Sequence, residues 1–63
     1  MELFSTVCIG NTGSILDGRQ GVLIGVVSEL PGMKIWIVYL DKPEPTYGYL
    51  GVPIPESCLF VLQ

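Results

Sequence analysis

The chain contains no histidine, and charged residues make up only 14% of its 63 residues, against about 25% in a typical soluble domain. Without histidine and with two cysteines, too few ligands remain for a zinc site. The six carboxylates are scattered, no serine has a base partner, and neither cysteine has a basic neighbour that would activate its thiol. We therefore expect no enzymatic activity, no metal and no cofactor.

Basic residues are the scarcest of the charged groups. Arg19, Lys34 and Lys42 stand against six acidic residues, and the net charge is −3. Binding of a phosphate backbone depends on clusters of Lys and Arg that release counterions. Three scattered cations form no cluster, so we expect no direct binding of nucleic acid.

Segments that would send the chain into or across a membrane are also missing. No apolar run approaches the ~18 residues of a membrane span, and residues 1–10 lack the basic start of a secretory signal. We therefore expect a cytoplasmic protein in which Cys8 and Cys58 are buried free thiols. A disulfide between them is the alternative, because an even count permits one.

What the chain has in excess is apolar residues, which make up 49% of it. Glycine and proline divide them into five short runs that are rich in Val, Ile, Phe, Tyr and Trp, as β-strands are. The runs cover residues 3–9, 21–29, 34–40, 49–54 and 59–62. The segment DKPEPTYG (41–48) carries two prolines and is expected to be a loop.

Five strands in so short a chain favour one small barrel, since closure removes the two edges that an open sheet exposes. Gly25 lies within the second run, where a strand bending around a barrel corner often needs a residue without Cβ. The segment PESC (55–58) predicts a single 3-10 turn before the last strand, begun by Pro55. We expect a single all-β domain over residues 1–63.

The order of these segments resembles the SH3-like barrel. DGRQGVLIGVV (17–27) is similar to the opening of KOW-type barrels. WIVYLD (36–41) is similar to the third strand, and VPIPESCLFVL (52–62) to the closing turn and last strand. The resemblance covers nearly the whole chain and implies a five-stranded SH3-like barrel. It implies no function, because this fold carries many unrelated ones.

Type II dihydrofolate reductases are homotetramers of a similarly small SH3-like barrel, with a Val-Gln-Ile-Tyr motif lining the central pore. The corresponding segment here runs from Gly51 to Ile54. Val52 replaces the glutamine and Ile54 the tyrosine, so the polar pore lining is missing. The resemblance therefore implies no reductase activity, but it leaves a homo-oligomer as an analogy.

The third run, KIWIVYL (34–40), is apolar on both faces of a strand, because successive side chains point to opposite sides. In SH3-like barrels the W-x-V-x-L-D phase points inward, which implies Val38 and Leu40 in the core. Every charge of the chain lies in an expected turn or at a strand end. An outer apolar face then remains, and we predict it to be an interface between proteins. Its predicted residues are Val22, Ile24, Ile35, Ile37 and Tyr39. The alternative is that the long loops fold over this face.

A second candidate site is an aromatic groove formed by Trp36, Tyr47 and Tyr49, since such grooves hold polyproline ligands in peptide-binding SH3 domains. The alternative places these aromatic residues in the core or in an interface.

Taken together, these features predict a non-catalytic interaction module whose partner is a second copy of itself or another protein. Two alternatives stay open. One is a homo-oligomeric barrel that binds a small ligand in a central pore, and the other is a KOW-like module that docks on the protein part of a nucleoprotein complex.

Overall fold

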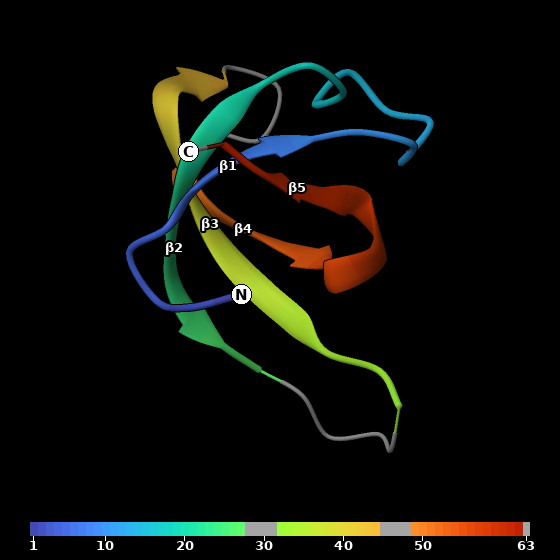
Figure 1. Cartoon of the computed structure of the whole chain (residues 1–63). Coiled ribbons are helices and arrows are strands. Elements are labelled where there is room, and N and C mark those ends of the chain that lie inside the picture. Colours follow the sequence, from blue (N-terminus) through green and yellow to red (C-terminus); the bar gives the residue numbers. More distant parts are fainter. Residues whose placement is uncertain (28–31, 45–48, 63) are drawn as a thin grey trace.

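Five antiparallel strands form one sheet in the computed structural model, which describes residues 1–27, 32–44 and 49–62 (Figure 1). The order of the strands in the sheet is β4-β3-β2-β1-β5. The elements are β1 (Thr6–Ile9), β2 (Gln20–Val26), β3 (Ile35–Glu44), β4 (Tyr49–Pro55), the 3-10 turn η1 (Glu56–Cys58) and β5 (Leu59–Val61). The all-β class, the five strands and the 3-10 turn before the last strand are confirmed.

The structure differs from the expected barrel in that the sheet is not closed. β4 and β5 stand at the two ends of the strand order, and within the described ranges they do not pair with each other. Figure 1 shows how the sheet instead twists and curls, while η1 carries the chain from one end of it to the other. Curvature thus encloses the inner face without a ladder between the edge strands.

Two strands, β3 and β4, run further along the chain than expected, and both include proline residues. β3 runs on to Glu44, so the expectation that DKPEPTYG is loop from its first residue is wrong for residues 41–44. Pro43 is tolerated there because the pairing of β3 with β4 is irregular between Tyr39 and Glu44. β4 includes Pro53 and Pro55, which an edge strand accepts when their nitrogens point away from its neighbour.

The core lies on the concave, inner side of the sheet and is built from apolar side chains of every strand. It comprises Val7, Ile9, Leu16, Leu23, Trp36, Val38, Leu40, Val52, Ile54 and Leu59. Val38 and Leu40 are at most 1% exposed, which confirms that this phase of β3 points inward. Leu16 comes from the loop between β1 and β2, so this loop closes part of the core.

Two glycines of β2 serve different purposes. A Cβ on Gly21 would lie 2.5 Å from the carbonyl oxygen of Tyr39, so β2 and β3 approach more closely there than any side chain allows. Gly25 belongs to a β-bulge, because the pairing of β2 with β3 shifts between Leu23 and Gly25. Gly25 therefore lies at a bulge and not at the corner of a closed barrel.

Candidate functional site

The candidate site is the outer face of β2, β3 and β4. Its residues are Val22, Ile24, Gly25, Ile35, Ile37, Tyr39, Gly51, Pro53 and Pro55, and below "the outer face" means these nine. The pairing of the strands sets them side by side: Val22 lies opposite Tyr39 and Tyr39 opposite Gly51, while Ile37 lies between Gly25 and Pro53. All five residues of the predicted interface therefore lie on one continuous surface.

The side chains at the centre of the outer face lie close to one another. A Cβ placed on Gly51 would be 3.4 Å from Cγ2 of Ile37 and 4.0 Å from Cδ1 of Ile24, so both isoleucines reach over this glycine. Ile24 is 45% exposed and Tyr39 46%, whereas Val22, Ile35 and Ile37 are half-buried. The bulge contributes to this arrangement because it turns both Ile24 and Gly25 toward Ile37.

None of these nine residues carries a charge, and at one end the charged groups lie beyond Val22 and Tyr39. Asp41 follows Tyr39 by two residues and forms an ion pair with Arg19, with 3.5 Å between Nη2 and Oδ1. The Arg19 guanidinium also donates a hydrogen bond to the carbonyl oxygen of Lys42. Lys34 directly precedes Ile35 and Glu56 directly follows Pro55, so the outer face is an apolar surface with charged residues at both of its ends.

The long loop between β1 and β2 packs on the inner side of the sheet and leaves the outer face open. Asp17 holds this loop by accepting hydrogen bonds from the backbone N–H of Thr12 (3.0 Å) and of Gly13 (3.1 Å). It also accepts one from the Thr12 hydroxyl. The Thr12 bonds, first that of the hydroxyl, lower the pKa of the Asp17 carboxyl below its ordinary value. The alternative that loops cover the outer face therefore does not apply to this loop.

The aromatic groove is not assembled around Trp36, because that side chain is 4% exposed and belongs to the core. Its indole Nε1 is buried without a hydrogen-bond partner among the described residues, and the Lys34 ammonium lies 5.5 Å from the centre of the ring. Tyr47 lies outside the described residues, and Tyr49 is placed only as the first residue of β4.

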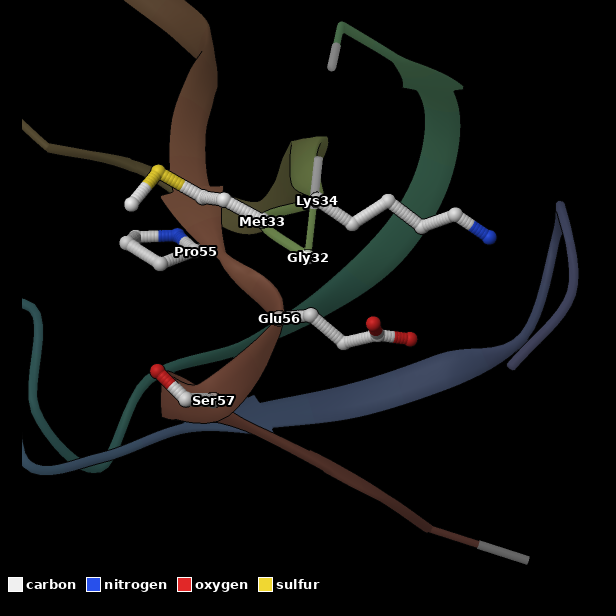
Figure 2. A pocket seen from close by; sticks show the side chains of 6 residues that line it. All are labelled: Gly32, Met33, Lys34, Pro55, Glu56 and Ser57. Carbon is white, nitrogen blue, oxygen red and sulfur yellow. The ribbon is translucent and has the colours of Figure 1, made fainter. Parts of the chain in front are cut away.

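A surface hollow of about 330 Å³ lies beside η1 and is lined by Gly32, Met33, Lys34, Pro55, Glu56 and Ser57. Figure 2 shows that the Lys34 and Glu56 side chains extend to one side while those of Met33 and Pro55 lie on the other. A small-molecule site needs polar groups that converge on an apolar wall, and this arrangement does not provide them.

Other chemistry is sparse in the described parts of the chain. Cys8 and Cys58 are free, half-buried thiols, and their sulfur atoms lie 3.7 Å from the carbonyl oxygens of Ile9 and Asn11, respectively. No three Cys, Asp or Glu side chains of these parts lie close enough together to hold a metal ion. No helix among the residues described is long and apolar enough to span a membrane.

Comparisons of the chain with models of protein families, with curated proteins and with solved structures found no match. The SH3-like resemblance therefore stays a prediction. Sequence reasoning missed the contribution of β4 to the outer face, namely Gly51, Pro53 and Pro55. The signal was available, because these residues alternate with Val52 and Ile54, the two buried side chains of the strand.

Proposed function

We propose that the protein is a non-catalytic interaction module that self-associates by stacking its outer face on the outer face of a second copy. The observation that carries this proposal is a face of nine uncharged residues on which Ile24 and Tyr39 are almost half exposed. Water contact with such a surface is unfavourable by about 25 cal/mol per Å² of apolar area. Stacking two copies removes this contact from both at once.

A second copy suits the outer face better than an unrelated partner of opposite charge. The net charge of −3 would oppose self-association if like charges faced each other across the interface. Two outer faces related by a two-fold axis bring no carboxylate opposite another, because none of the nine residues is charged. Symmetric pairing of one patch with itself is also the commonest form of oligomer.

Dependence of mass on concentration tests this proposal. Sedimentation velocity and light scattering of the wild type should give a mass above 6.9 kDa that rises with concentration. Ile24→Glu should lower the mass to that of the single chain, since stacking would bury a carboxylate without a partner. The matched control is Val26→Glu, because Val26 lies in the same strand and is 48% exposed but is not part of the outer face.

A wild-type mass of 6.9 kDa at every concentration would contradict self-association and favour the monomeric docking module instead. If the measured mass of the assembly fell equally in the two Glu variants, association would not depend on the outer face. Circular dichroism of both variants establishes that each one is folded.

A further inference from the structure

The two edges of the sheet differ in what they offer to another strand, and β4 is the blocked edge. The N–H of Glu56 donates to the carbonyl oxygen of Lys34 at 2.8 Å. Hydrogen bonding alternates along an antiparallel strand. The backbone N–H and C=O groups of Val52 and Ile54 therefore also point toward β3. The backbone groups of Gly51, Pro53 and Pro55 point away from it, toward the open edge. Proline has no N–H, so two of the three outward positions of β4 cannot donate a hydrogen bond.

The opposite edge, β5, carries no such block. Leu62 donates its N–H to the carbonyl oxygen of Thr6 at 2.8 Å, and Cys58 accepts from Gly10 at 2.9 Å. By the same alternation, the backbone N–H and C=O groups of Phe60 point toward β1, and those of Val61 point outward. In the described part of the chain, no strand lies beyond β5.

The last two side chains of β5 and that of Leu62, which follows the strand, are apolar and exposed. Phe60 is 47% exposed, Val61 44% and Leu62 37%, and no charged residue lies between Leu59 and Leu62. Native edge strands are usually protected by charge, proline or a cover. β5 has neither charge nor proline, which is the pattern of an edge that receives a strand.

We propose that β5 pairs with β5 of a second copy, antiparallel and about a two-fold axis at Val61, so that two sheets join into one. In this pairing each Val61 donates its N–H to the C=O of the other, and Phe60 lies opposite Leu62 of the partner. The proposal rests on the proposed self-association but places it on a second surface.

The size of the outer face argues for this second contact. Three strands about 4.8 Å apart, with about five residues of 3.4 Å each, make a patch of roughly 10 Å by 17 Å. Stable interfaces bury about 800 Å² on each partner, several-fold more than this patch. A second copy at β5 supplies additional contact and again brings no charged residue of β5 opposite another.

Amide hydrogen exchange of Val61 tests edge pairing directly, because stacking of the outer faces leaves this N–H exposed to water. At protein concentrations at which the mass exceeds that of one chain, exchange at Val61 should slow by about tenfold or more relative to a dilute sample. Unchanged exchange at Val61 together with a rising mass would overturn edge pairing and leave outer-face stacking intact.

Val61→Pro transfers to β5 the block that β4 already has. Of the backbone hydrogen-bonding groups it removes only the outward N–H, and it also fixes φ at this position. We expect it to lower the mass of the assembly, whereas the matched variant Val61→Ala keeps the N–H and should retain association. Should Val61→Pro fail to fold, the double variant Pro53→Val/Pro55→Val provides the converse test. It opens the β4 edge and should raise the mass above that of the wild type.

The outcomes separate the two surfaces. Loss of association in Val61→Pro but not in Ile24→Glu would support the edge and overturn outer-face stacking. Wild-type mass in folded Val61→Pro would overturn the edge. A wild type that stays a single chain at every concentration would overturn the pairing of β5 together with outer-face stacking.

Discussion

The two faces of β2, β3 and β4 are equally apolar but differ in what covers them. Along β2, Leu23 is fully buried while its neighbour Ile24 is 45% exposed. The inner face is enclosed by the curvature of the sheet, by Leu59 of β5 and by Leu16 of the long loop, whereas the described loops leave the outer face uncovered. Hydrophobicity alone therefore does not distinguish the buried face from the exposed face in a chain this small.

The largest expected change in the free energy of unfolding comes from truncating a side chain of the inner face. The same truncation on the outer face provides the comparison. Leu23→Ala should destabilise the fold by about 2–5 kcal/mol, since it leaves a cavity in the core. That range is a large part of the roughly 3–9 kcal/mol expected for a domain of this length, so we expect a variant that is much less stable than the wild type. Ile24→Ala should cost less than about 1 kcal/mol in the single chain, because Ile24 is almost half exposed there.

Urea denaturation at a concentration low enough to keep the protein as single chains measures both free energies of unfolding. Equal losses in the two variants would mean that the outer face stabilises the single chain as much as the core does. At high concentration the Ile24→Ala loss should grow, because the variant then also loses interface contacts.

A smaller effect is expected from adding a methyl group to each glycine of β2. Gly21→Ala places a Cβ 2.5 Å from the Tyr39 carbonyl oxygen and 2.7 Å from Cγ1 of Val38, and such overpacking costs about 1–3 kcal/mol. A Cβ on Gly25 meets only Ile37, at 3.9 Å, an ordinary contact. Gly25→Ala should therefore leave stability unchanged or raise it slightly, since glycine weakens strands.

Thermal unfolding followed by circular dichroism compares these two variants with the wild type. If Gly25→Ala were as unstable as Gly21→Ala, the bulge would have no room for a side chain at position 25. Gly21→Ala at wild-type stability would show that β2 and β3 can separate without loss.

Alternation along β3 predicted that Val38 and Leu40 share one face and Ile37 and Tyr39 the other. Because both faces are apolar, only the resemblance to SH3-like barrels implied which of them is the inner one. The open edges of the sheet could not be predicted from the sequence, because pairing between β4 and β5 depends on how far the sheet curls. The bulge at Ile24 was equally hidden, since a glycine in an apolar run fits a corner and a bulge alike. The site was thus predicted on β2 and β3 and missed on β4.

The smallest effect concerns the loop that helps to cover the inner face. The folded protein lowers the pKa of Asp17 below its ordinary value of 3.8, so its carboxylate stabilises the fold above about pH 4, and this contribution is lost as the pH falls through the folded pKa. Asp17→Asn should therefore be less stable than the wild type at neutral pH, and the difference should vanish in acid. Thr12→Val removes the hydroxyl donor and should show an intermediate loss.

Melting temperatures of the three proteins between about pH 2 and pH 7 test this linkage. A constant gap between wild type and Asp17→Asn across that range would mean that the carboxylate charge contributes nothing and that only the shape of the side chain matters. A gap that closes in acid, with Leu16 less protected in the variant at neutral pH, ties the cover of the inner face to one surface carboxylate. No described residue plays that part on the outer face, whose cover on our proposal is a second chain.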